Sequence, residues 1–165
     1  MNDIASPWFV LRAETGREEK VFEQVLAHGM EAFLPFYSDT RRWSRRPPEI
    51  VRRALFPGYI FGRFEVWELA CARAVPGVID ILSFGPTAAT VPDVEIENLR
   101  VVVASGLAEP WNLLKVGQQV TITHGPFAGI RGRLIEIKNK LRFVVGVELF
   151  NRGVSVEVES GMLAA

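Results

Sequence analysis

The chain has 165 residues, 48% of them hydrophobic, and its 19 basic residues are balanced by 19 acidic ones. This length accommodates one or two domains, and the even charge argues against a protein that binds nucleic acid through its overall field. A single cysteine excludes an internal disulfide, no Cys/His spacing suggests zinc, and no apolar run approaches the roughly 18 residues of a membrane-spanning helix. We therefore expect a soluble, cytoplasmic, monomeric protein without cofactors and without a membrane partner.

The first third of the chain predicts strands around one helix. Residues 8–11 form an apolar run typical of a strand. Thr15 and Glu18 fit the capping box of a helix that Gly29 would end. Residues 30–37 predict a second strand.

A third strand is expected within residues 50–64, where the dipeptide Pro57-Gly58 predicts a sharp turn. Side chains alternate along a strand, so Tyr59 and Phe61 share the face opposite the aliphatic one. Two aromatic residues on one face indicate either a second layer of core or a docking surface.

The pattern then continues with a helix over residues 65–75 and a fourth strand over residues 78–84. A last helix is expected after Pro92, with an apolar face formed by Ile96, Leu99 and Val103. This order predicts an α+β fold, an α/β sandwich in which helices pack on a mostly antiparallel sheet.

The character of the chain changes near residue 105. We expect an N-terminal domain over residues 1–106, a linker over residues 107–115 and a C-terminal domain over residues 116–165. In the last segment apolar residues recur with a period of two between tight turns. Such short strands predict a small, SH3-like β-barrel.

At this point the sequence resembles the NusG family of transcription elongation factors. The N-terminal part is similar to the family's NGN domain, with the motifs W-F-V-L at 8–11, T-G-x-E-x-K-V at 15–21, L-F-P-G-Y at 55–59 and V-P-G-V at 75–78. Residues 116–132 resemble a KOW domain, with the motif V-G-x-x-V-x-I-x-x-G-P-F-A-G-x-x-G. The two matches occur in the family's order and spacing.

The resemblance implies a factor that binds the β′ clamp helices of RNA polymerase through its NGN domain and suppresses pausing or termination. The implied polymerase-binding residues are Trp8, Phe56, Tyr59, Phe61 and Phe84. Aromatic side chains suit this role because they bury a large area at low entropic cost. The alternative for these residues, and for Trp8 and Phe56 in particular, is an ordinary place in the core.

A second implied surface is rich in arginine. The resemblance places it near upstream or non-template DNA, and its residues are Arg41, Arg42, Trp43, Arg45, Arg46, Arg52 and Arg53. Arginines there would contact phosphates, and Trp43 could stack on an unpaired base. The alternative is a loop or hairpin tip that charge keeps in solvent.

The KOW domain would recruit Rho or a small-subunit ribosomal protein. The implied partner-binding residues lie in two loops and are Phe127, Ile130, Asn151 and Arg152. The many glycines and valines here oppose a helical alternative state, so we expect a permanent barrel.

Two departures from the family's common pattern indicate which kind of family member this chain resembles. The second KOW loop has F-N-R at 150–152 instead of F-G-R, and six arginines between positions 41 and 53 are unusual. Both favour a specialised RfaH-like or polysaccharide-locus paralogue over the housekeeping factor.

Two other classes of protein fit the sequence less well. An enzyme is not expected, because neither His28 nor His124 has a nucleophile beside it in a recognised pattern, and Cys71 fits a small buried packing residue. An RNA-binding or ribosome-associated KOW protein is the alternative function, but it predicts a stronger positive charge.

Overall fold

The computed structural model describes residues 5–111, 118–137, 140–147, 152–159 and 162–164. The chain forms two compact units. The first combines Met1–Leu34 with Phe56–Asp93, and the second combines Pro35–Leu55 with Val94–Ala165. Among the described residues, no helix has the length and apolar character needed to cross a membrane.

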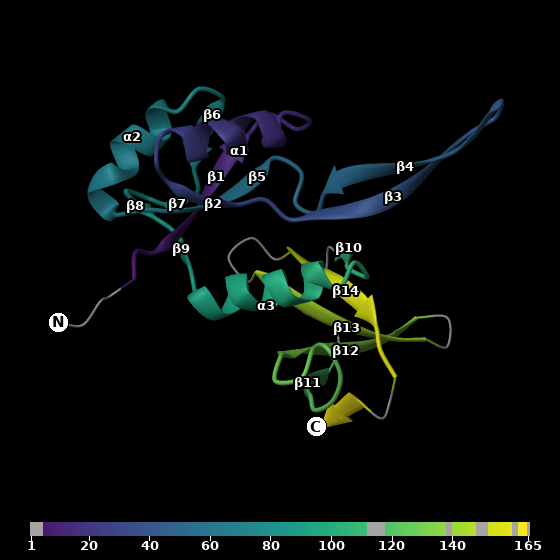
Figure 1. Ribbon diagram of the computed structural model, residues 1–165. Helices are drawn as coiled ribbons and strands as arrows, with labels where there is room; N and C mark the ends of the chain where they lie inside the picture. Colours follow the sequence, from purple (N-terminus) through teal and green to yellow (C-terminus); the bar gives the residue numbers. More distant parts are fainter. Residues whose placement is uncertain (1–4, 112–117, 138–139, 148–151, 160–161, 165) are drawn as a thin grey trace. The chain divides into compact units, whose positions relative to one another are not determined.

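The first unit is built on a five-stranded antiparallel sheet (Figure 1). Its strands and helices are β1 (Trp8–Ala13), α1 (Glu18–Ala27), β2 (Glu31–Phe33), β5 (Tyr59–Arg63), the 3-10 turn η1 (Val66–Glu68), α2 (Leu69–Ala74), β6 (Val78–Ile81), β7 (Ser83–Phe84), β8 (Thr87–Ala88) and β9 (Thr90–Val91). The strand order is β2-β5-β1-β6, and β9 also pairs with β1. Helix α1 packs against β2 and β5, and α2 packs against β6.

The register of β5 confirms how its side chains are divided between the two faces of the sheet. Phe61 lies opposite Val10 and Phe33 on the neighbouring strands. On the other face, Phe64 stacks on Phe9 with ring centroids 4.8 Å apart. Both faces of the sheet are buried, so the core of this unit lies on either side of β1 and β5.

The capping box expected at the start of α1 is wrong in detail. Helix α1 begins at Glu18, and the cap residue Arg17 makes no side-chain capping bond. The Glu18 carboxylate instead accepts hydrogen bonds from the backbone N–H groups of Gly16 and Gly58, both at 2.8 Å. This buried carboxylate ties the helix to the Pro57-Gly58 turn, where Gly58 has a φ of +84° that few other residues adopt.

The second unit contains a long hairpin, one helix and a six-stranded sheet (Figure 1). Its elements are β3 (Phe36–Trp43), β4 (Arg46–Ala54), α3 (Asp93–Ala104), β10 (Glu109–Trp111), β11 (Gln118–Ile122), β12 (Arg131–Ile137), β13 (Lys140–Val147), β14 (Arg152–Glu157) and β15 (Leu163–Ala164). Asp93, the first residue of α3, belongs to the first unit, and the rest of α3 belongs to the second.

The antiparallel C-terminal sheet has the strand order β10-β14-β13-β12-β11-β15. The fully or almost fully buried side chains of this sheet include Val120, Ile122, Phe143, Val144, Val145, Val147, Val154, Ser155 and Val156. Because consecutive residues of β13 and β14 are buried, both faces of these two strands are covered there. The predicted fold class is therefore confirmed: helices on an antiparallel sheet are followed by a small β domain. The described part of this domain is made of strands, as expected for a barrel and not for a helical hairpin.

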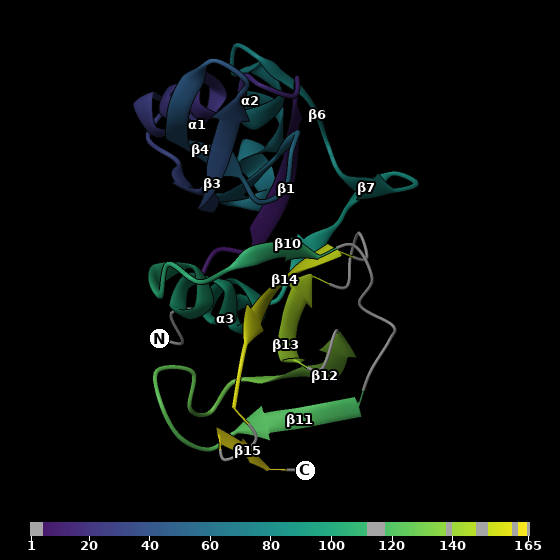
Figure 2. The ribbon, with the colours of Figure 1, turned by 90° about the vertical axis from the view of Figure 1, so that its right-hand side faces the viewer.

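Part of the expected linker is a strand. Glu109, Pro110 and Trp111 pair with Ser155, Val154 and Gly153 of β14, and β10 thereby extends the C-terminal sheet at its edge (Figure 2). A strand of three residues is too short to show the alternation of apolar and polar side chains. Pro110 also argues against a strand in the sequence, because proline is tolerated in a sheet only at an edge.

Three smaller expectations are corrected. The strand expected over residues 30–37 is divided, because Pro35 separates β2 from β3. The buried face of α3 consists of Ile96, Leu99 and Val102, so Val102 takes the place expected for Val103. Cys71, expected to be buried, is exposed on α2.

Candidate functional site

The five aromatic residues expected to bind polymerase do not form one exposed surface. Trp8, Phe56 and Phe61 are at most 1% exposed, Tyr59 is half-buried, and Phe84 is 67% exposed. The expectation that Phe61 contributes to an exposed docking face together with Tyr59 is therefore wrong. Phe61 is a core residue.

The burial of Phe61 follows from its neighbours. Its ring lies 6.0 Å from that of Phe33 on β2 and 5.7 Å from that of Phe56, which meets it edge-on. Phe56 is held there by the turn that follows, in which Tyr59 N–H donates to the Phe56 carbonyl at 3.0 Å. The motif around the Pro57-Gly58 turn thus builds an aromatic cluster inside the first unit.

Phe84 lies in a different environment. It ends β7, which pairs with β8 through Ser83 opposite Ala88 and Phe84 opposite Thr87 (Figure 2). Gly85 makes the turn with a φ of +59°. A two-stranded hairpin this short leaves the Phe84 ring in solvent, so this residue is available to a partner.

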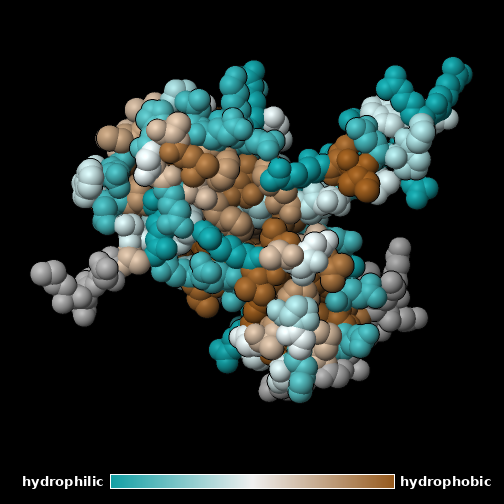
Figure 3. All heavy atoms as spheres, in the orientation of Figure 1, coloured by the Kyte–Doolittle hydropathy of each residue, from teal (hydrophilic) through white to brown (hydrophobic). Residues whose placement is uncertain are grey.

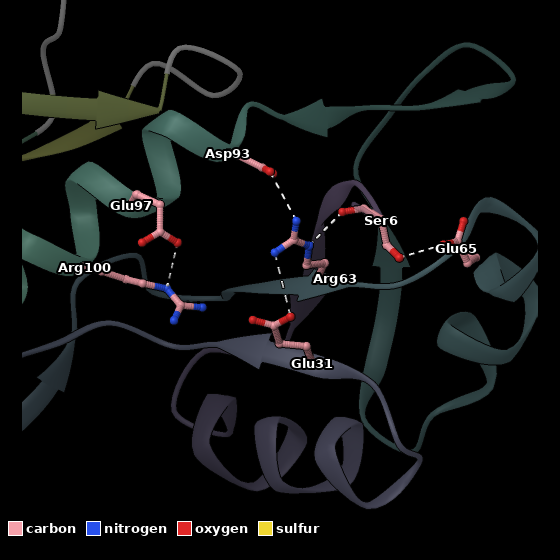
Figure 4. Close-up of polar contacts among 7 residues, drawn as sticks. All are labelled: Ser6, Glu31, Arg63, Glu65, Asp93, Glu97 and Arg100. Atoms are coloured by element: carbon pink, nitrogen blue, oxygen red, sulfur yellow. Dashed lines mark hydrogen bonds and ion pairs between the residues drawn. The ribbon is translucent and has the colours of Figure 1, made fainter. Parts of the chain in front are cut away.

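An arginine that the sequence did not single out organises the polar side of the first unit (Figure 4). Arg63 Nε donates to the Ser6 carbonyl at 2.8 Å, and its guanidinium pairs with Asp93 at 3.2 Å and with Glu31 at 4.0 Å. It also lies 5.5 Å from the centre of the Trp8 ring. The sequence does not reveal the role of Arg63, because this residue ends a mostly apolar strand and its acidic partners are distant in sequence.

The arginine-rich segment is a hairpin and not an irregular loop. Strands β3 and β4 pair from Phe36 opposite Ala54 to Trp43 opposite Arg46, with an irregularity between Arg41 and Trp43. Residues 41–50 are all exposed, and Figure 3 shows hydrophilic residues over the outer end of the hairpin. The hairpin therefore brings all the arginine residues expected near nucleic acid onto one two-stranded ribbon.

The residues expected at the KOW partner edge are also divided. Phe127 is 2% exposed and Ile130 is 4% exposed, so both are core residues, and Arg152 is half-buried at the start of β14. Asn151 lies outside the described residues. Gly132 is explained by packing, since a side chain there would meet Phe143.

Within the described residues, no group of three or more His, Cys, Asp or Glu side chains could hold a metal ion. The architecture combines an α/β unit that bears an exposed aromatic, a basic hairpin and a small β domain. An exposed aromatic ring and a basic hairpin are surfaces suited to binding other macromolecules, so the fold and these surfaces are those of a binding protein.

Comparison with known proteins specifies this class. The model of the family described as "Transcription termination factor nusG" matches residues 6–100. The chain is 32% identical to the transcription termination/antitermination protein NusG of Vibrio vulnificus (strain CMCP6), over 94% of this chain and 93% of that protein. It is 26% identical to the NusG protein of Thermus thermophilus, over 92% of this chain and 94% of that protein.

A solved structure described as "Domain interaction in Thermotoga maritima NusG" aligns with 96% of this chain and 96% of its own, with 25% identity and a TM-score of 0.54. The chain belongs to the NusG family and is a NusG-type transcription termination/antitermination factor. The matches span both parts of the chain, which a ribosome-associated KOW protein does not explain.

Proposed function

We propose that this protein binds the β′ clamp helices of RNA polymerase through its NGN domain and suppresses pausing or termination. Its membership of the NusG family supports this role. The main structural support for the proposal is the Phe84 ring, which is exposed in the first unit, as is that of Trp67, whereas Trp8, Phe56 and Phe61 are buried. The half-buried Tyr59 is the second contact that we assign to the polymerase.

Aromatic side chains are suitable anchors for a helical tip. They bury a large area and lose little conformational entropy, so one or two of them at the centre of an interface supply much of its affinity. Phe61, Phe56 and Trp8 would act in this proposal by supporting Tyr59 and the turn before it. Their direct contact with polymerase would require them to become accessible.

The KOW domain is proposed to recruit a further factor, Rho or a small-subunit ribosomal protein. Of the three expected residues that the structure describes, Arg152, at the start of β14, is the one that retains access to solvent. Because Phe127 and Ile130 are buried, their role in this proposal is to hold the loop between β11 and β12 in place.

The basic hairpin is proposed to lie near upstream or non-template DNA when the protein is bound to polymerase. The outer part of the hairpin, residues 41–50, carries four arginines and one glutamate, a net charge of 4 − 1 = +3. Exposed arginines contact phosphates without reading sequence. A specialised, operon-specific role for this chain remains a prediction.

The test is binding of the full chain to purified bacterial core RNA polymerase. The wild type should bind, and the variant Tyr59→Ala/Phe84→Ala should lose about 2 kcal/mol or more of binding free energy. Ile79→Ala, another exposed apolar residue of the first unit, is the matched control and should bind like the wild type. Equal binding by the double variant would overturn the assignment of these two aromatics.

A further inference from the structure

The turn that leads into β5 is held by hydrogen bonds on both sides of Gly58, directly before the half-buried Tyr59. The Gly58 N–H donates to Glu18 Oε1 at 2.8 Å, and the Gly58 carbonyl accepts a hydrogen bond from the Ala13 N–H at 2.9 Å. Ala13 ends β1, and Glu18 begins α1. The backbone that carries Tyr59 is therefore fixed to a strand on one side and to a helix on the other.

The buried position of the Glu18 side chain, which is 6% exposed, calls for an explanation. Burying a carboxylate costs free energy unless hydrogen bonds or an opposite charge compensate. Among the described residues no basic side chain pairs with it, and its two oxygens accept from the N–H groups of Gly16 and Gly58. The first turn of α1 also favours a negative charge through the helix dipole. The carboxylate thus holds two backbone amides at a fixed separation, and its bond to Gly58 spans 40 positions of the chain.

The turn has little freedom to move in other directions. Gly58 has a φ of +84°, and a Cβ atom there would lie 3.3 Å from the Ala13 carbonyl oxygen and 3.4 Å from Thr15 Oγ1. The turn therefore lies directly against the connection between β1 and α1. At its other end, the Phe56 ring is anchored edge-on against the buried Phe61 ring. An apolar contact holds one end of the turn, and the Glu18 carboxylate holds the other.

From this geometry we propose that Glu18 is a positioning residue of the polymerase-binding surface. Its carboxylate is buried, so it acts through the Gly58 backbone on Tyr59 and not by contact with the partner. A side chain that is already held in its binding position loses less conformational entropy when the complex forms, and the affinity is higher for that reason. This inference rests on the proposed contact between Tyr59 and polymerase, and it adds a residue that lies outside that contact.

Replacing Glu18 by glutamine tests the carboxylate itself. Glutamine has nearly the same size, but its NH2 group cannot accept a hydrogen bond, so it serves only one of the two amides. We expect Glu18→Gln to bind purified bacterial core polymerase about tenfold more weakly than the wild type, because the turn then spends less time in the binding position. Glu23→Gln, at an exposed position of the same helix, is the matched control and should bind like the wild type.

A double-mutant cycle tests whether Glu18 acts through Tyr59. In Tyr59→Ala the ring to be positioned is absent, so the further change Glu18→Gln should weaken binding by less than about twofold. Val25→Ala, at a fully buried residue of α1, separates positioning from stability. It leaves a cavity and lowers the stability of the fold, but it should keep the affinity of the wild type. Urea denaturation would verify that every variant is folded under the conditions of the binding measurement.

Titration of the labelled full chain with core polymerase distinguishes this inference from the proposed function. No binding by the wild type would overturn both. If the wild type binds and Tyr59→Ala weakens binding, an unchanged affinity of Glu18→Gln would overturn the positioning role alone. The positioning role would also be wrong if Glu18→Gln had the same effect with and without Tyr59, if Tyr59→Ala bound like the wild type, or if Val25→Ala lost as much affinity as Glu18→Gln.

Discussion

At the scale of single residues, the two phenylalanines Phe61 and Phe84 show how one residue type serves two purposes. Phe61 is fully buried between Phe33 and Phe56 and stabilises the sheet of the first unit. Phe84 is exposed at the end of β7. Alternation along β5 predicted which residues share a face, but it could not predict that the face would be covered, because that depends on Phe33 and Phe56 from other segments.

Stability measurements on these two residues test their roles. Phe61→Ala should lower the free energy of unfolding by about 3 to 5 kcal/mol, because it leaves a cavity among aromatic rings. Phe84→Ala should change it by no more than about 0.5 kcal/mol, as expected for an exposed side chain. Urea denaturation of both variants is the measurement, and a small effect of Phe61→Ala would contradict the core assignment.

At the scale of elements, strand β10 is the feature that the sequence did not predict, since it lies within the expected linker. It pairs with β14 at the edge of the C-terminal sheet, and a row of polar side chains joins β13, β14 and β10. Arg142 on β13 donates from Nε to Ser155 Oγ at 3.1 Å and pairs through its guanidinium with Glu109. The sequence does not reveal this row, because its three members lie on three strands separated by up to 46 positions, from Glu109 to Ser155. The hairpin residues, in contrast, are close in sequence and were predicted together.

Removing Arg142 should loosen β10. Arg142→Ala removes one ion pair and one hydrogen bond, which together stabilise the docked strand by about 1 kcal/mol. Hydrogen exchange of the amides at residues 153–155 should therefore become several times faster in the variant. Arg131→Ala, at an exposed arginine of β12, is the control and should leave these amides protected. Unchanged exchange in Arg142→Ala would show that β10 is held by its backbone alone.

At the scale of the whole molecule, the family membership and the α+β class followed from short motifs whose residues have local physical roles. Gly58 makes a turn, Gly132 leaves room for Phe143, and alternating valines form the C-terminal sheet. The limits of the two units were not predictable in the same way. The chain crosses between them at positions 34–35, 55–56 and 93–94, so each unit is assembled from segments that are distant in sequence.

We propose above all that this NusG-type factor acts on the elongating polymerase. The most direct measurement is single-round transcription by a purified bacterial core polymerase on a template with a strong pause site, with and without the full chain. We expect a shorter pause and more read-through with the wild type, and little effect with Tyr59→Ala/Phe84→Ala. Identical pausing with and without the wild-type protein, at concentrations that saturate its binding to polymerase, would contradict it.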